Sequence, residues 1–265
     1  PLMVASQNGH LPIVERLLAQ GANPNVKRFD GQTCFFVACQ NGYLGVVQRL
    51  YAEKVDTHAT KDARTPLLAA CQYGHVPVVD YLLEHGALAD VERATSEGDT
   101  PLMAACEAGH SPIVERLLAR GANPNVISDR GKTCFYLACR NGHLDVVQRL
   151  YAEKVDTHAE DKDGQTPLIG ACDKGHVPVV DWLFEHGAKA DLERAMKNGV
   201  TPLIIASREG HLTIVERLLA QGANRDKDQE CCYWACQRGH LGVVQRLYAE
   251  KVDIHVATKD GWTPL

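Results

Sequence analysis

TPLMAACEAGHSPIVERLLARGA, residues 100–122, contains the pattern from which the fold can be predicted. Thr100 is a candidate N-cap, because its side-chain oxygen can accept from the free amides of a first helical turn. Pro101 fits the first helical position, where its missing N–H costs nothing. Gly109 favours a helix end in a backbone conformation that a side chain would resist, and Pro112 then opens a second helix. The stretch predicts two short helices joined by a tight turn.

Both predicted helices carry apolar residues at helical spacing. In the first helix, Leu102, Ala105 and Cys106 fall on one face, and their small average size allows close packing. The second helix has a broader apolar stripe, made of Ile113, Val114, Leu117 and Leu118. Helices of this length are not stable alone in water. Stacking against neighbours is therefore required.

The chain repeats this unit along its whole length. Residues 46–59, VVQRLYAEKVDTHA, return unchanged at 146–159 and with two changes at 243–256. A shorter period lies inside this long one. The first residue of each TPL-like or TCF-like signature is Thr33, Thr65, Thr100, Thr133, Thr166, Thr201, Glu230 and Thr263, so that the steps run from 29 to 35 residues. One unit of about 33 residues is the building block.

These residues and this period resemble the ankyrin repeat, a family with a unit of 33 residues, a β-turn plus two helices and a T-P-L-H-x-A motif. Further support comes from DKDGQTPLIGACDKGHVPVVDWLFEHGA, residues 161–188, and from a Gly-His turn in nearly every unit. The turn histidines are His10, His75, His110, His143, His176, His211 and His240. The resemblance implies an all-α solenoid of about eight stacked helix-turn-helix pairs with β-hairpin loops, as a single array over residues 1–265.

The expected units have approximate bounds 1–27, 28–60, 61–94, 95–127, 128–160, 161–195, 196–227 and 228–256, with a partial unit at 257–265. The hairpin between Gly222 and Ala235 lacks four residues relative to the one between Gly121 and Ala138, so we expect it to be stunted. Both ends fall within a unit. We expect a longer array, or neighbouring chains that cover the ends, because interior repeats expose an apolar face when uncapped.

Composition and charge exclude several function classes. A net charge of -5 and a pI near 6.2 argue against a nucleic-acid binder, which needs a basic face to displace counterions from phosphates. No apolar run approaches the roughly 20 residues of a membrane helix, and PLMVASQNGH is not a signal peptide. Ten cysteines are too sparse for a disulfide-stapled secreted scaffold. We expect no membrane insertion and a reducing, intracellular location, cytoplasmic or nuclear.

The cysteines and histidines suggest a metal site, but their spacing argues against one. Six cysteines share one repeat position on the first helix: Cys39, Cys71, Cys106, Cys139, Cys172 and Cys236. Equivalent positions in stacked units lie about 10 Å apart, too far for coordination at about 2.3 Å. We expect buried structural thiols, and turn histidines that bond backbone groups of the adjoining loop. Acidic residues in the ERLLA, AEK and GADL-type segments are expected to be solvated.

No P-loop, GxGxxG, GxSxG, HExxH or paired CxxC motif is present. We therefore expect no enzymatic activity, no metal and no cofactor. The remaining class of function is binding of another molecule by the surface of the protein. The ankyrin resemblance implies that hairpin tips and the exposed face of the first helix line a concave groove. The candidate protein-binding residues so assigned are Phe29, Gln40, Arg64, Tyr73, Arg130, Lys132, Arg140, Lys174, Arg208, Arg238 and Trp262.

Two readings stay open for some features. Phe36, Tyr136 and Tyr233 suit either core packing under the hairpin or an exposed position. The three-unit cycle suits either a periodic, multivalent partner or a recent duplication, and the variation between tips such as 29–31 and 129–131 favours duplication.

The sequence predicts a non-catalytic scaffold that binds a protein partner of unknown identity along the concave face. The alternative is an architectural subunit or spacer in a larger complex, which contacts neighbours through the array ends or convex helices. A third hypothesis is an array attached to a catalytic domain outside residues 1–265.

Overall fold

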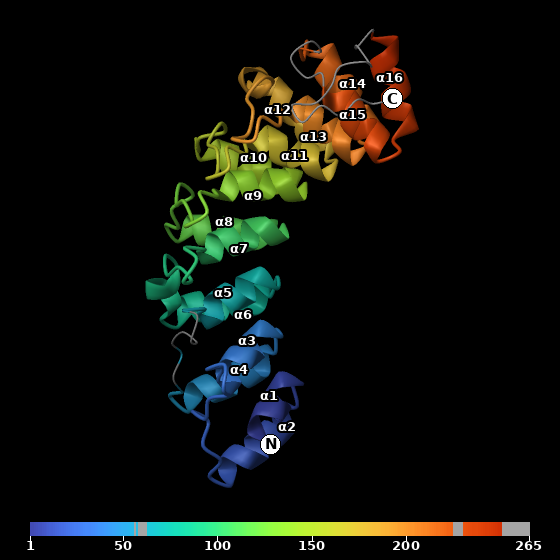
Figure 1. Cartoon of the computed structure of the whole chain (residues 1–265). Helices are drawn as coiled ribbons and strands as arrows, with labels where there is room; N and C mark the ends of the chain where they lie inside the picture. Colours follow the sequence, from blue (N-terminus) through green and yellow to red (C-terminus); the bar gives the residue numbers. More distant parts are fainter. Residues whose placement is uncertain (56, 58–62, 225–229, 251–265) are drawn as a thin grey trace. The chain divides into compact units, whose positions relative to one another are not determined.

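The computed structural model describes residues 1–55, 57, 63–224 and 230–250, and these form helix pairs in two compact units, Pro1–Asp129 and Arg130–Leu265 (Figure 1). The first unit contains α1 (Leu2–Gln7), α2 (Leu11–Ala19), α3 (Cys34–Gln40), α4 (Leu44–Ala52), α5 (Pro66–Gln72), α6 (Val76–Glu84), the 3-10 helix η1 (Ala87–Asp90), α7 (Pro101–Ala108) and α8 (Ser111–Ala119). The second contains α9 (Cys134–Asn141), α10 (Leu144–Ala152), α11 (Pro167–Lys174), α12 (Val177–Glu185), η2 (Ala188–Asp191), α13 (Pro202–Glu209), α14 (Leu212–Ala220), α15 (Glu230–Gln237) and α16 (Leu241–Ala249).

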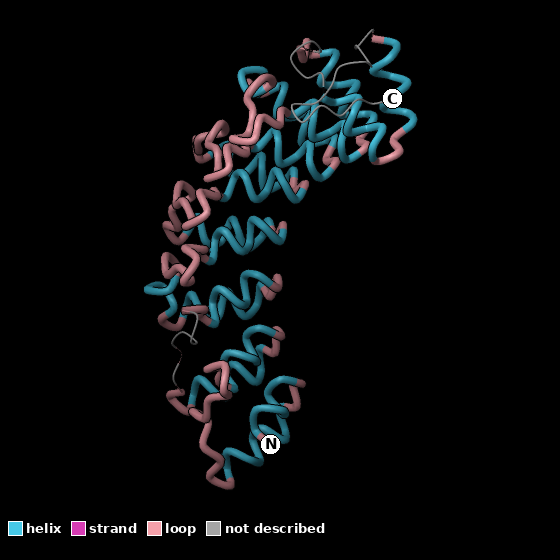
Figure 2. The backbone as a smooth tube through the Cα atoms, viewed as in Figure 1, coloured by secondary structure: helices cyan, strands magenta, loops and turns pink. Residues whose placement is uncertain are grey.

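Each unit is built from two rows of helices. In the first, α1, α3, α5 and α7 pack one against the next, and so do α2, α4, α6 and α8. In the second, α9, α11, α13 and α15 form one row and α10, α12, α14 and α16 the other. Figure 2 shows that, within each unit, the longer loops between pairs gather along one side. The predicted solenoid of about eight helix pairs is confirmed.

Buried threonines begin the first helices, as the sequence predicts. Thr100 Oγ1 accepts from the backbone N–H of Met103 at 3.3 Å, and Thr65 does the same for Leu68 at 3.0 Å. Equivalent caps form at Thr33, Thr133, Thr166 and Thr201. Each cap satisfies an amide that helix geometry leaves without a partner. The repeated threonine therefore sets where every capped helix begins.

The first helices supply most of the core. In α7, residues 101–106 are all buried, including Cys106 at the predicted position. The second helices bury only one face; in α8, Ile113, Val114 and Leu117 are fully buried while Leu118 is only half-buried. A helix buried on all sides must lie between others, so the first helices form the inner row of each stack.

The Gly-His turns join successive repeats. His75 Nε2 donates to the carbonyl of Gln40 at 2.8 Å, and His240 Nε2 to that of Arg208 at 3.0 Å. The acceptors therefore lie at the end of the preceding repeat's first helix rather than in the adjoining loop that we expected. Gly42 has a φ of +78°, which residues with a side chain rarely adopt, and a Cβ there would clash with the ring of His75, so both features favour glycine.

The expected β-hairpins form as turns, and the described ranges contain no strand. In the loop 161–165, the N–H of Asp161 donates to the carbonyl of Gln165 at 3.1 Å and that of Gly164 to Asp161 at 3.0 Å. Loops 28–32, 95–99 and 196–200 repeat this pattern, and we call these four loops, together with loop 128–132 at the corresponding place before α9, the fingers. The stunted hairpin predicted after Gly222 and the partial unit 257–265 lie outside the described residues.

Leu117→Ala should lower the free energy of unfolding by about 2–5 kcal/mol, because the Leu117 side chain is fully buried. Leu118→Ala, in the same helix but half-buried, is the matched control and should cost less. Denaturant titration measures both. Hydrogen exchange should show greater loosening in adjacent repeats than in distant ones, since each repeat contacts only its neighbours. Equal loss of protection in all repeats would contradict this coupling.

His176 should make stability fall on acidification. Burial lowers the pKa of His176 below its usual 6.5; the bond to the Arg140 carbonyl opposes this shift, and the nearby His143, His211 and Lys174 reinforce it. The folded state thus binds a proton less readily than the unfolded state, so stability is lost as pH falls through about 6.5 and below.

His176→Gln removes this titration, so its melting temperature should fall less between pH 7.5 and 5.5 than that of the unaltered chain. Melting at pH 8, where His176 is neutral, isolates the cost of the substitution itself. Parallel pH profiles for the two proteins would show that His176 is not responsible.

Candidate interaction surface

Most of the sequence-predicted residues lie on the fingers and at the ends of the first helices, and Arg64 directly precedes the N-cap residue Thr65 of α5. Phe29, Gln40, Arg64 and Tyr73 belong to the first compact unit, and residues 130–238 of the set belong to the second. Trp262 lies outside the described residues. The structure therefore presents two separate groups.

Phe29 is the most exposed aromatic side chain of the described residues, at 93%. The guanidinium carbon of Arg28 lies 5.6 Å from its ring centroid, and Arg28 also pairs with Asp30 at 3.6 Å. An aromatic ring held in water beside a cation contributes little to folding. Such rings are frequent anchors at protein interfaces.

The ends of α3 and α5 bring three other candidates close together. Gln40 Nε2 donates to the hydroxyl of Tyr73 at 3.4 Å, and Arg64 donates to Gln72 Oε1. Tyr73 remains 49% exposed. This part of the first unit is polar and aromatic.

In the second unit, ion pairs connect the corresponding helix ends. Asp173 lies between Lys174 at 3.1 Å and Arg140 at 3.9 Å. Glu209 accepts from Arg208 Nε at 2.9 Å and from Arg238 at 2.7 Å. The finger residue Arg130 is exposed and Lys132 half-buried. The surface is predominantly basic.

The aromatic positions left open are now assigned. Phe36 and Tyr136 are buried, at 2% and 1% exposure, so they are core residues, whereas Tyr233 is only partly buried. The hydroxyl of Tyr136 lies 3.1 Å from Gln165 Oε1. Burial raises the pKa of Tyr136 to about 12, although Arg140 opposes the shift.

The thiols are structural in character. Cys39, Cys71, Cys106, Cys139 and Cys172 are buried, while Cys236 is partly exposed. Burial raises the pKa of Cys34 to about 11 and raises that of Cys71 further. Thiols that stay protonated are poor nucleophiles and poor metal ligands.

Two observations concern metals and membranes. Over residues 1–55, 57, 63–224 and 230–250, no three metal-ligating side chains cluster closely enough to hold an ion. None of the helices in these ranges has the length and apolar character that a membrane crossing requires.

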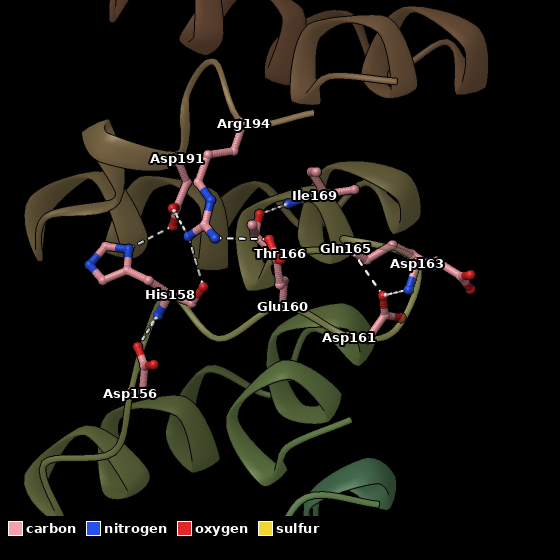
Figure 3. Close-up of polar contacts among 10 residues, drawn as sticks. All are labelled: Asp156, His158, Glu160, Asp161, Asp163, Gln165, Thr166, Ile169, Asp191 and Arg194. Atoms are coloured by element: carbon pink, nitrogen blue, oxygen red, sulfur yellow. Dashed lines mark hydrogen bonds and ion pairs between the residues drawn. The ribbon is translucent and has the colours of Figure 1, made fainter. Parts of the chain in front are cut away.

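The sequence did not predict a polar network between successive repeats of the second unit (Figure 3). Asp191, 1% exposed, accepts from His158 Nδ1 at 2.8 Å and from Arg194 at 3.1 Å. Arg194 also donates to the carbonyl of His158 at 3.0 Å and to Glu160 at 2.8 Å. The bond to Asp191 raises the pKa of Arg194. The expectation that acidic residues of such segments are solvated is wrong for Asp191.

A signal for this network was present in the spacing. The steps from Thr65 to Thr100 and from Thr166 to Thr201 are the longest in the chain. The extra residues form η1 and η2, which end at Asp90 and Asp191, and Asp191 bonds His158 of the preceding repeat. The length of these two steps alone did not show that a carboxylate would be buried in the extra residues.

Arg194→Met should destabilise the second unit by about 1–3 kcal/mol, because it removes the arginine donor of the buried Asp191 carboxylate. Arg93→Met is the matched control in the first unit: its partner Asp90 is 14% exposed and 3.5 Å away, so the loss should be smaller. Denaturant unfolding of both variants measures the difference. A larger loss for Arg93→Met would contradict the importance of burial.

Comparisons with known proteins agree with this architecture. The family model described as ankyrin repeats (3 copies) matches residues 2–94, 44–128, 87–161 and 135–229. The crystal structure of the human ASB11 ankyrin repeat domain superposes with a TM-score of 0.73 at 27% identity, over 84% of this chain and 98% of that one. A comparison with curated protein sequences finds no match. Ankyrin repeats are generally modules for protein–protein interaction. With matches across most of its length and a stack of threonine-capped helix pairs, the chain belongs to the ankyrin-repeat family.

Proposed function

We propose that this chain is a non-catalytic scaffold that binds a partner protein through its fingers and first-helix ends. The main support is an internal comparison. Residues 11–109 and 111–210 are two copies of the same three-repeat block, and among positions that are at least partly exposed in both copies they differ mainly at the fingers and first-helix ends. The differing pairs include Phe29/Asp129, Asp30/Arg130, Gln32/Lys132, Gln40/Arg140, Gln72/Asp173, Tyr73/Lys174, Glu97/Asn198 and Glu107/Arg208.

The second helices and the residues that directly follow them provide the contrast. Glu15/Glu115, Glu53/Glu153 and Lys54/Lys154 are exposed in both copies and unchanged. Exposed positions generally tolerate substitution at a cost within about 0.5 kcal/mol, so folding alone does not explain why divergence is concentrated on the fingers and first-helix ends. Diversification for recognition explains it.

The fingers are also held in place before any partner arrives. In the first unit, the backbone N–H of Asp129 donates to the backbone carbonyl of Glu97 at 3.0 Å. In the second unit, the backbone N–H of Lys162 donates to the carbonyl of Arg130 at 3.1 Å, and the backbone N–H of Lys197 donates to the carbonyl of Asp163 at 3.0 Å. Because adjacent fingers are tied by main-chain bonds, binding requires little loop ordering. The unbridged cysteines support the accompanying proposal of a reducing, cytoplasmic or nuclear location.

The architectural role is the second candidate, and the unchanged exposed residues of the second helices favour it. Three copies of QRLYAEK, at 48–54, 148–154 and 245–251, keep the same residues. Contacts of a larger assembly through this face would maintain them.

Site-specific photo-crosslinking separates the two roles. A photoreactive residue at Phe29 or Tyr73 should crosslink a partner that is retained by the full chain, whereas one at Gln48 or Gln148, on the second helices, should not. The double variant Phe29→Ala/Tyr73→Ala should lose that partner with little change in melting temperature, because Phe29 is 93% and Tyr73 49% exposed. Crosslinks confined to the second helices would reject finger recognition in favour of the architectural role.

A further inference from the structure

The ends of the first helices in the second unit carry a cation in each successive repeat. Arg140 lies in the last turn of α9, Lys174 ends α11, Arg208 lies in the last turn of α13, and Arg238 directly follows α15. Their side chains are between 25% and 48% exposed. Four cations therefore follow one another along one row of helix ends.

These cations are only partly neutralised. Asp173 is shared by Arg140 and Lys174, and Glu209 by Arg208 and Arg238, so that each cluster has two positive charges and one negative charge. Arg140 Nε is buried and has no hydrogen-bond partner in the part of the chain that the structure describes. Its ion pair with Asp173, at 3.9 Å, is too long for a hydrogen bond. Because the Arg140 side chain is 31% exposed, its terminal guanidinium nitrogens retain donors for an incoming carboxylate, whereas the buried Nε does not reach one.

Folding of the repeat does not require these charges. The carbonyls of Asp173 and Arg208, at the helix ends, already accept from His211 at 3.2 Å and from His240 at 3.0 Å. The matching helix ends of the first copy carry Gln40, Tyr73 and Glu107 instead. A stack of the same design therefore forms without a basic row.

We propose that Arg140, Lys174, Arg208 and Arg238 form a binding surface for an acidic peptide segment of a partner protein. Packed helices lie about 10 Å apart, and an extended peptide advances about 3.3 Å per residue. A segment crossing the row meets a new cation about every third residue, so the best ligand has Asp or Glu at that spacing. This inference rests on the proposed function, because it specifies the partner of the same surface.

Charge complementarity favours a peptide over a nucleic acid. Asp173 and Glu209 lie among the cations, where they repel a continuous phosphate backbone but leave room for separated carboxylates. Arginine guanidinium groups bind carboxylates with paired, directional hydrogen bonds.

The test uses the full chain and three fluorescein-labelled peptides of equal length: one with Glu at every third residue, one with Gln at those positions, and one with the same Glu residues clustered at one end. Fluorescence anisotropy at physiological salt should show binding of the spaced Glu peptide. The Gln peptide and the clustered peptide should bind more weakly, the former by about tenfold or more.

Arg140→Gln/Arg208→Gln should weaken binding of the spaced peptide by about tenfold or more, with an unchanged melting temperature. Arg149→Gln/Arg246→Gln removes the same charge from the exposed second helices and should leave binding intact. Equal weakening by both pairs would overturn the proposal, since net charge alone would then account for binding.

Tighter binding of a single-stranded DNA oligonucleotide than of any peptide would also overturn the proposal, in favour of nucleic acid. If no acidic peptide binds while crosslinks from Phe29 or Tyr73 still capture a partner, the acidic ligand is wrong and finger recognition stands. If neither occurs, both proposals fail.

Discussion

Burial of each short first helix between its neighbours is the constraint on which the rest of this structure depends. A helix such as α7, with residues 101–106 buried, has no face left for solvent and is too short to be stable alone. The threonine caps, the glycine turns and the histidine bonds to the preceding repeat all serve this arrangement, because each satisfies a backbone group at a junction. Stability within a unit is thus shared between neighbours and has no single centre.

Because the buried positions of the first helices hold the stack together, the fingers and first-helix ends can vary between repeats. Fingers and first-helix ends contribute little to the core, so Gln40 and Arg140 can occupy matching positions in the two block copies without altering the stack. The first unit presents an exposed phenylalanine and a half-exposed tyrosine, and the second a row of basic residues. One framework therefore supports two chemically different surfaces.

The buried Asp191 shows a different use of charge. Its carboxylate links the loop after α10 to the loop after α12 through His158 and Arg194, in a position where apolar contact alone would not specify the geometry. Directional hydrogen bonds select one arrangement of the longer loops. The aromatic cluster of Tyr151, Trp182 and His186, with the last two rings stacked at 3.9 Å, lies on the same second-helix side. Both features join the longest repeat of the cycle to the repeat before it.

The sequence by itself determined the fold, because the position of each element depends on local chemistry. Thr100 begins a helix, Gly109 ends it, and small residues such as Ala105 require close neighbours. It also determined which positions vary between copies. Only the tertiary structure decided the partners: the turn histidines bond the preceding repeat, Tyr136 is core, and Asp173 pairs with Arg140. These outcomes depend on contacts between residues about 30 or more positions apart, and the period of the sequence does not specify which side chains meet across a junction.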